Sequence, residues 1–243
     1  MSINKGYIYS TNLTIKESSN DCYYQSLESS VKDLTINVEK NANVEFLFFN
    51  SKLNLEVNQS ELSNVTIYNV YLLDESSQIN INVNLNERDS FVKIINVYLT
   101  KNTNKLVSNV LINHKALSTS SDLETYAIAQ NESNQVLNNN AHIYNGMHNS
   151  NAHQTTKGLC LNKNSKIQAQ PNLFIDEYDV QASHSASIGS IDSEELFYLM
   201  SRGLTESKAR EMIVMGFIIP IIDKIQDEEV KQNIYKQFTN SLK

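Results

Sequence analysis

The side chains best suited to bind a metal or move a proton near neutral pH are five histidines and two cysteines. Neutral imidazole and thiolate both bind iron, zinc and copper. The chain carries these groups at His114, His142, His148, His153, His184, Cys22 and Cys160. Two cysteines cannot supply a four-thiolate zinc or iron–sulfur site within one chain, and they argue against a disulfide framework.

Three of the histidines lie in one Asn-rich stretch, between residues 138 and 154. The spacing of His142, His148 and His153 could gather a metal site. Strand geometry does not obviously bring their side chains together, however. We therefore favour the interpretation that they are scattered histidines on solvated turns.

The other common signatures of chemistry are absent. The sequence has no Gly-rich phosphate loop, no GxSxG, no HExxH and no paired-cysteine motif. The balance of 27 acidic and 20 basic residues gives a net charge of -7, without a Lys/Arg cluster, so we expect no nucleic-acid partner. No apolar run approaches the ~20 residues needed to cross a bilayer, and residues 1–14 lack the apolar core of a signal peptide. We expect a cytoplasmic protein without membrane contact.

Short strands must position these side chains over most of the chain. From Leu34 to about Ile188, runs such as residues 34–38, 53–57 and 79–85 alternate apolar and polar residues, which predicts strands. Many short strands indicate a sandwich, a barrel or a β-solenoid. The chain has only six glycines and no Asn-Gly or Asp-Gly pair, which weakens the hairpin folds and favours wide turns between parallel rungs. The many asparagines fit stacked ladders inside the turns, but we favour a codon bias as their origin.

The hydrophobic period changes after Ser190. Asp192, Thr205 and Asp227 are predicted to cap three helices, and Gly203 to end the first of them. The predicted buried stripe of the second helix is Ala209, Ile213, Phe217 and Ile221, and that of the third is Val230, Ile234 and Phe238. The sequence therefore divides into a lead segment (1–30), a β core (31–190) and a small C-terminal helical domain (191–243).

One long stretch around His184 resembles a known family. Residues 178–192 read YDVQASHSASIGSID, residues 195–204 read ELFYLMSRGL, and AHQ (152–154) and PNL (171–173) precede them. The order and spacing resemble the SufB/SufD family of iron–sulfur cluster assembly proteins. The core of that family reads approximately A-H-Q, P-x-L, D-D-V-x-C-S-H-G-A-T-V-G-x-L-D and F-Y-L-x-S-R-G-I. The match covers about residues 142–225, and the upstream body is similar in strand style only.

The resemblance implies a mainly β fold, a right-handed parallel β-helix (solenoid) followed by a small C-terminal helical domain. It also implies partners. SufB-type and SufD-type subunits pair through their β-helices, and each binds a SufC-type ATPase through its helical region. The complex builds an iron–sulfur cluster, so the resemblance implies a transient cluster shared with the partner and no tightly bound cofactor in the isolated subunit.

The residues at which SufB-like and SufD-like chains differ favour a SufD-like, non-catalytic scaffold. SufB-like chains carry Glu after the matching histidine, whereas this chain has Ser185. The resemblance makes His184 the candidate for cluster assembly and for iron ligation, as a metal ligand shared across subunits. Two departures weaken a two-ligand site in this subunit: Ala182 replaces the family cysteine, and Ser185 replaces the family glycine.

The resemblance places the ATPase-docking candidates at the end of the first helix: Phe197, Tyr198, Arg202 and Gly203. Cys160, between two leucines, is interpreted as a small buried hydrophobic residue, and nothing supports a role for Cys22. Two alternatives stay open: a SufB-like or homodimeric scaffold that works with SufC alone, and a β-solenoid carbohydrate-active or adhesive protein. The second would need acidic side chains clustered along one face of the solenoid.

Overall fold

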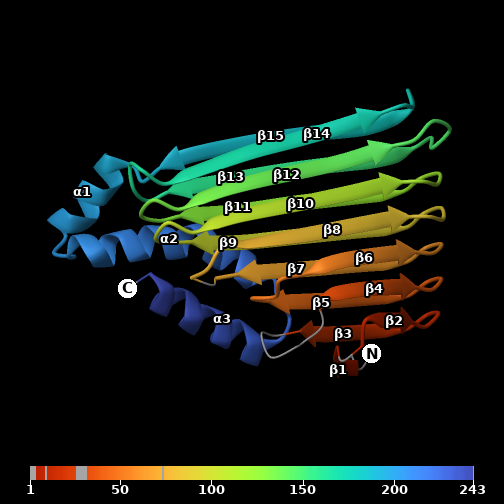
Figure 1. Ribbon diagram of the computed structural model, residues 1–243, viewed down its shortest axis with the longest axis horizontal. Helices are drawn as coiled ribbons and strands as arrows, with labels where there is room; N and C mark the ends of the chain where they lie inside the picture. Colours follow the sequence, from red (N-terminus) through yellow and green to blue (C-terminus); the bar gives the residue numbers. More distant parts are fainter. Residues whose placement is uncertain (1–3, 9, 26–31, 73, 243) are drawn as a thin grey trace.

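The computed structural model describes residues 4–8, 10–25, 32–72 and 74–242 (Figure 1). The strands of this part of the chain form two parallel sheets, and successive strands alternate between them. Sheet A contains, in order, β1 (Asn4–Tyr7), β3 (Asn20–Gln25), β5 (Asn43–Phe49), β7 (Asn64–Tyr71), β9 (Phe91–Thr100), β11 (Ser120–Ala129), β13 (Ser150–Cys160) and β15 (Val180–Ser190). Sheet B contains β2 (Asn12–Ile15), β4 (Asp33–Val38), β6 (Asn54–Gln59), β8 (Ser77–Leu85), β10 (Lys105–His114), β12 (Asn134–Ile143) and β14 (Lys166–Ile175).

This arrangement confirms a parallel β-solenoid followed by helices, because each turn of the chain adds one strand to each sheet. The turns widen along the chain. In sheet A, aligned residues of successive strands are 21 positions apart in the sequence at Asn43 and Asn64, and 30 positions apart at Asn151 and Gln181. Strand length grows with this spacing, from 7 residues in β5 to 11 in β15.

The solenoid begins before the point where the alternating pattern becomes recognisable. Strands were predicted from Leu34, after a lead segment of residues 1–30. Within the described part of that segment, β1, β2 and β3 form, and β3 pairs with β5 from Asn20↔Asn43 onward. The first two strands have only four residues each, too few to show a clear period.

Asparagine, aspartate and serine explain how the turns form with so few glycines. Left-handed backbone is adopted at Asn41 (φ 56°), Asp89 (φ 58°), Ser118 (φ 56°) and Asn149 (φ 60°), and Asn and Asp tolerate that region better than most residues. These turns stack, because the Asn41 N–H donates to the Glu61 carbonyl of the next rung at 3.0 Å. Wide stacked turns therefore replace the Gly-containing hairpins that an antiparallel fold needs.

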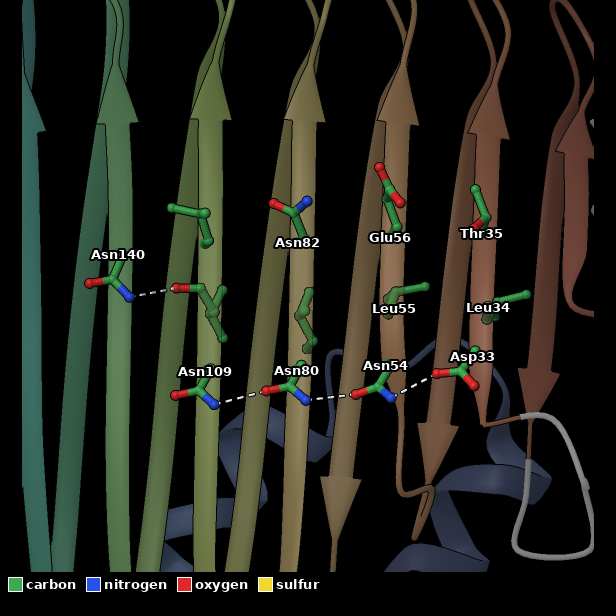
Figure 2. A pocket seen from close by; sticks show the side chains of 13 residues that line it. Asp33, Leu34, Thr35, Asn54, Leu55, Glu56, Asn80, Asn82, Asn109 and Asn140 are labelled. Carbon is green, nitrogen blue, oxygen red and sulfur yellow. Dashed lines mark hydrogen bonds between the residues drawn. The ribbon is translucent and has the colours of Figure 1, made fainter.

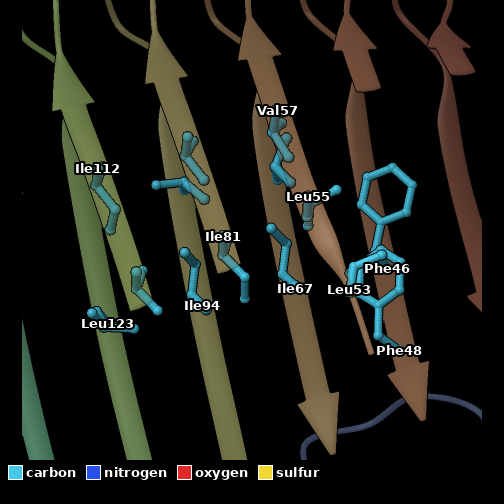
Figure 3. Packing of buried hydrophobic residues seen from close by; sticks show 14 of the residues in the cluster. Phe46, Phe48, Leu53, Leu55, Val57, Ile67, Ile81, Ile94, Ile112 and Leu123 are labelled. Carbon is cyan, nitrogen blue, oxygen red and sulfur yellow. The ribbon is translucent and has the colours of Figure 1, made fainter. Parts of the chain in front are cut away.

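Alternate side chains of both sheets meet inside the solenoid. Figure 3 shows Phe46, Ile67 and Ile94 of sheet A beside Leu55 and Ile81 of sheet B. All five are buried. This interior confirms the period-two pattern, which assigned alternate residues to one buried face.

Asparagine ladders run along the outward face of sheet B (Figure 2). Side-chain amides donate from Asn54 to Asp33 at 2.7 Å, from Asn80 to Asn54 at 2.6 Å and from Asn109 to Asn80 at 2.8 Å. Asp33 can only accept, so it fixes the direction of every amide that follows. The ladder ties consecutive rungs together. A further asparagine contact stacks in the turns, where the Asn131 amide donates to Asn102 at 3.1 Å, so the asparagines form ladders although a codon bias was the favoured interpretation.

Three helices follow the solenoid: α1 (Ser193–Ser201), α2 (Glu206–Ile222) and α3 (Glu228–Ser241). Each predicted cap is confirmed, since Asp192, Thr205 and Asp227 accept backbone N–H bonds within the first turn of their helices. Gly203 follows α1 with a left-handed φ of 94°, which a glycine adopts without strain. No helix in the described ranges is long and apolar enough to span a membrane.

Helices α2 and α3 pack on the outer face of sheet A through a second apolar cluster. Val214 and Ile218 of α2 and Ile234 and Phe238 of α3 are buried there against residues of β5, β7, β9 and β11. The predicted stripe of α2 is confirmed at its ends, where Ala209 and Ile221 are buried. In the middle the buried face is turned by one residue, so Ile213 and Phe217 are only half-buried. The predicted stripe of α3 is confirmed at Ile234 and Phe238.

Candidate functional site

The site is the open end of the solenoid, where the last rung lacks a neighbour. Among the described strands, β14 pairs with β12 alone and β15 pairs with β13 alone. In Figure 1 these strands form one edge of the stack, and the N-terminal strands form the opposite edge. A strand edge without a partner presents unpaired N–H and C=O groups, which favours pairing with another chain.

The register fixes which side chains of the last rung face inward. Buried Ala152, Gln154 and Gly158 of β13 align with Ala182, His184 and Ile188 of β15. Inward residues of β12 align in the same way with β14. Ile175 and Ser190, the last residues of the two strands, continue the inward series and align with Ile143 and Cys160. We call the remaining inward side chains of β14 and β15 the end face: Ile167, Ala169, Pro171, Leu173, Val180, Ala182, His184, Ala186 and Ile188.

The end face is apolar except for one side chain. His184 is its only residue with a polar side chain. No further rung covers it, so His184 and Ile188 are exposed, and Ile188 is 41% accessible. The site therefore consists of one imidazole within an uncovered apolar surface.

The backbone of β14 sets the hydrogen-bonding state of His184. Its Nδ1 lies 3.2 Å from the Pro171 carbonyl oxygen. A carbonyl oxygen only accepts, so Nδ1 carries the proton and donates. The neutral ring then keeps the lone pair of Nε2 free, and Nε2 is a suitable ligand for iron.

A buried amide supports the imidazole from the rung below. Gln154 aligns with His184 and is 2% exposed. In the orientation that satisfies both of its polar atoms, its side chain reaches the backbone of β12 in sheet B, where it donates to the Asn139 carbonyl at 3.2 Å and accepts from the Ala141 N–H at 3.1 Å. Gln154 therefore links sheet A to sheet B directly beneath the position of His184.

The two departures from the family pattern lie on opposite faces of β15. Ala182 is an inward residue of the end face, so it brings no thiol to His184. Ser185 points outward and donates to the Thr155 hydroxyl at 3.4 Å. In the described part of the chain, no three His, Cys, Asp or Glu side chains lie close enough to hold a metal ion.

The other histidines have separate structural partners. His142 contacts Asp176 at 2.7 Å, His148 contacts Glu177 at 3.3 Å, and His153 contacts Ser183 at 2.8 Å. Each of these contacts joins the β12–β13 rung to the last rung. The interpretation that all three lie on solvated turns is wrong for His142 of β12 and His153 of β13, and only His148 lies in a turn.

His114 and the two cysteines lie away from the end face. His114 is buried between the Thr119 and Ser121 hydroxyls, and burial lowers the pKa of its imidazole to about 4. Cys160 ends β13 and is only half-buried, whereas it was interpreted as buried. Cys160 is partly exposed because it is the last residue of its strand and lies near the open end of the solenoid, beneath Ser190 of β15. Cys22 is buried, with its Sγ 3.8 Å from Glu45 Oε1.

Helix α1 exposes most of its apolar side chains. Phe197 is 73% and Tyr198 is 56% accessible, and none of the residues of α1 is buried. The Arg202 guanidinium lies 5.2 Å from the Tyr198 ring centre, and Gly203 ends the helix. Figure 1 places α1 beyond the ends of β14 and β15, so the docking candidates and His184 form separate surfaces.

Sequence reasoning missed an apolar corner beside the end face. Phe174 and Ile175 end β14 and are 52% and 42% accessible, and Tyr178 in the following turn is fully exposed. The available signal was the consecutive apolar run Leu173-Phe174-Ile175. Similar runs in β5 and β9 are buried, so the run alone does not predict exposure.

Comparison with known proteins identifies the family. Residues 11–217 match the model of the SufBD core domain of the SUF system for FeS cluster assembly. The chain belongs to the SufBD family. The predicted membership is thereby confirmed, and the matched region contains the whole end face and α1.

Individual relatives indicate a SufD-like chain. It is 31% identical to the iron–sulfur cluster assembly protein SufD of Bacillus subtilis over 118 residues, which is 49% of this chain and 27% of that protein. Identity to SufD of Escherichia coli is 34% over 88 residues, covering 36% and 21% of the two chains. A SufBD family protein of Pyrococcus horikoshii is 42% identical over 78 residues, covering 32% and 18%. The aligned stretches therefore cover about a quarter or less of each relative.

Proposed function

We propose that this SufD-like chain is a non-catalytic scaffold subunit in iron–sulfur cluster assembly. In this proposal the end face pairs with the solenoid of a SufB-type partner, and α1 docks a SufC-type ATPase. The cluster is the cargo of the complex, transiently shared with the partner. This chain contributes one ligand, Nε2 of His184.

The observation that carries the proposal is the uncovered end face. Unpaired edges on both sheets and a row of exposed apolar side chains favour burial against a second solenoid. Such burial would also remove water from around His184, which strengthens its interactions with a metal. A single ligand on this side requires the remaining ligands to come from the partner.

The surface of sheet B does not favour a carbohydrate-active solenoid. A shallow groove of 530 Å³ lies there, and among its lining residues only Asp33 and Glu56 are acidic (Figure 2). Asp33 accepts from Asn54 at 2.7 Å and Glu56 accepts from Asn84 at 3.3 Å. Both carboxylates thus accept hydrogen bonds from the amide ladders. Glycoside hydrolysis needs a pair of carboxyl groups that are free to transfer a proton, so this groove does not provide one.

The test uses a complex reconstituted with the SufB-type and SufC-type proteins of the same organism. His184→Ala should leave assembly intact and lower the cluster yield roughly tenfold or more, since a ligand is lost. His153→Ala is the matched control, because His153 lies one register position from His184 and points outward. Equal yields from wild type and His184→Ala would remove His184 from the chemistry. Failure to capture either partner would refute the scaffold role.

The mass of the complex in solution distinguishes the homodimeric scaffold from the mixed complex. The chain has a mass of 27.6 kDa, so light scattering distinguishes monomer, dimer and mixed complex. A stable dimer that still binds the ATPase would favour the homodimeric scaffold over the mixed complex.

A further inference from the structure

The side-chain amides on the outer face of sheet B point in one direction. The ladder that starts at Asp33 runs on to β12, where the Asn138 amide donates to Asn109 at 2.7 Å. In Figure 2 the nitrogen of Asn54, Asn80 and Asn109 lies toward the earlier strand, and the oxygen lies toward the later one. Because Asp33 can only accept, every amide that follows must keep this direction to stay bonded.

This direction leaves a hydrogen-bond acceptor at the end of the ladder. The side-chain oxygen of Asn138 lies toward β14, and no donor in the described part of the chain bonds to it. The aligned residue of β14 is Gln170, whose side chain is exposed. Gln170 can satisfy Asn138 only with its amide nitrogen, and its own oxygen is then directed beyond the last rung.

A second acceptor lies two residues further along β14. The Asn172 amide nitrogen donates to the Asn140 side chain at 2.9 Å and to the Gln170 carbonyl at 3.3 Å, which uses both of its hydrogens. Its oxygen receives no hydrogen bond from the residues that the structure describes, and the side chain is exposed. Residues two apart on a strand share a face, so the uncovered edge of sheet B presents two acceptor oxygens in a row.

A neighbouring ladder shows how a column of amides is closed within the chain. Asn113 donates to Asn84 at 3.1 Å, and its oxygen accepts from the Tyr144 hydroxyl at 3.4 Å. The next residues of this column are His142 and Phe174, and the His142 ring stacks on Tyr144 with ring centres 3.8 Å apart. Aromatic rings therefore end this ladder, whereas the columns that reach β14 as amides are left open.

We propose that Gln170 and Asn172 form an acceptor pair that selects the chain bound at the end face. The matching surface is a strand at the edge of the partner's solenoid, with amide, ammonium or guanidinium donors at two positions two residues apart. These donors continue the ladders across the junction. This selection rests on the proposed function, in which a SufB-type solenoid pairs with this edge.

The selectivity comes from the free-energy cost of an acceptor that is covered without a donor. When a partner covers the edge, water leaves these oxygens, and an oxygen that loses water without gaining a donor destabilises the complex. A partner with apolar or acidic side chains opposite the acceptor pair is therefore disfavoured. The direction of the ladders thus contributes to specificity by penalising the wrong partner.

A second copy of this chain is one of the disfavoured partners. If β14 met β14 of another copy, oxygens would face oxygens across the junction. Turning the Asn172 amide over to present its nitrogen would break its bond to Asn140 and place two oxygens together there. The acceptor pair therefore favours a mixed complex over self-pairing through β14.

The test is calorimetric titration of the SufB-type partner with variants of the chain at Gln170 and Gln168. Gln168 lies on the same strand and the same side, but it aligns with Val136, so it ends no amide ladder. A lysine at either position adds the same charge and length, and its ammonium group cannot accept. Gln170→Lys should raise the Kd about tenfold over that of Gln168→Lys, because a partner donor then faces an ammonium group. Equal dissociation constants would overturn the proposal.

A carboxylate at the same positions reverses the expected sign. Glutamate keeps acceptor oxygens, so Gln170→Glu should bind the partner at least as tightly as Gln168→Glu. If Gln170→Glu and Gln170→Lys weakened binding equally, position 170 would simply be intolerant of change, and the acceptor pair would be refuted. All four variants change exposed side chains, so circular dichroism should show the wild-type fold for each.

Failure of the proposed function gives a different result. A wild-type chain that does not bind the SufB-type partner would refute the pairing itself, whereas wild-type binding with equal lysine variants would refute only the acceptor pair. Light scattering of the chain alone tests the selection against a second copy. The chain should remain monomeric at concentrations at which the mixed complex forms, and a dimer as tight as the mixed complex would contradict the selection.

Discussion

His184 derives its chemical character from its neighbours rather than from the motif alone. The motif indicated the residue, and the register of β15 shows that it shares a face with Ala182 and Ala186. The 3.2 Å contact to Pro171 was not predictable, because it joins two strands of different sheets through a backbone oxygen. That contact leaves Nε2 as the free nitrogen. Sequence reasoning also could not show that the face is uncovered.

The tautomer of His184 is directly measurable. In the neutral ring, Nδ1 should be protonated and Nε2 should show the ¹⁵N shift of an unprotonated nitrogen. Long-range ¹H–¹⁵N correlation spectra of the isolated chain check this, with His184→Gln used to assign the signals. A protonated Nε2 in the neutral ring would contradict the role of the Pro171 carbonyl.

The elements were largely predictable where a period or a cap defines them. The strands after Leu34, the three caps and the Gly203 stop follow from local rules, and the structure contains them. The short strands β1–β3 and the rotation of the buried face of α2 could not be predicted from these local rules. Both depend on packing against other elements, which local periodicity does not encode.

The last rung depends on close packing at one glycine. A Cβ added to Gly158 would lie 3.1 Å from Ile188 and 3.2 Å from Ile167, the end-face residues above it. Gly158→Ala should therefore cost about 1–3 kcal/mol in urea unfolding and weaken pairing, because both side chains must shift. Gly189→Ala in β15 meets nothing within 4 Å and is the matched control. Equal unfolding midpoints for the two variants would count against this packing.

Two phenylalanines of the C-terminal helices allow the contribution of these helices to stability to be tested separately from their proposed role in ATPase docking. Phe238 of α3 is fully buried, so Phe238→Ala should reduce the free energy of unfolding by about 3–5 kcal/mol. Phe197 of α1 is 73% exposed, so Phe197→Ala should change stability by less than about 0.5 kcal/mol. In a pull-down with the SufC-type ATPase, Phe197→Ala should nevertheless reduce binding. Unchanged ATPase binding would remove α1 from the docking surface.

The whole molecule is a tapered stack with different ends and two differently covered faces. Helices cover the outer face of sheet A, and amide ladders line the outer face of sheet B. The last rung is among the widest, and it carries His184 at an uncovered end of the stack. The scarcity of glycine favoured wide turns over hairpins, and the family resemblance implied the parallel β-helix. Neither could reveal the taper, which arises from the growing sequence spacing between aligned residues of successive rungs.

Pairing through the end face is the central claim, and neighbouring residues of β15 offer the most direct test. Ala186 faces inward on the end face, and Ser187 aligns with exposed Lys157 on the outer side. An arginine at either position adds the same charge and volume. Sedimentation velocity of each variant with the SufB-type partner measures the complex. Ala186→Arg should abolish the complex, because an arginine cannot be buried without a partner, and Ser187→Arg should retain it. Equal complex formation by both variants would contradict pairing through the end face.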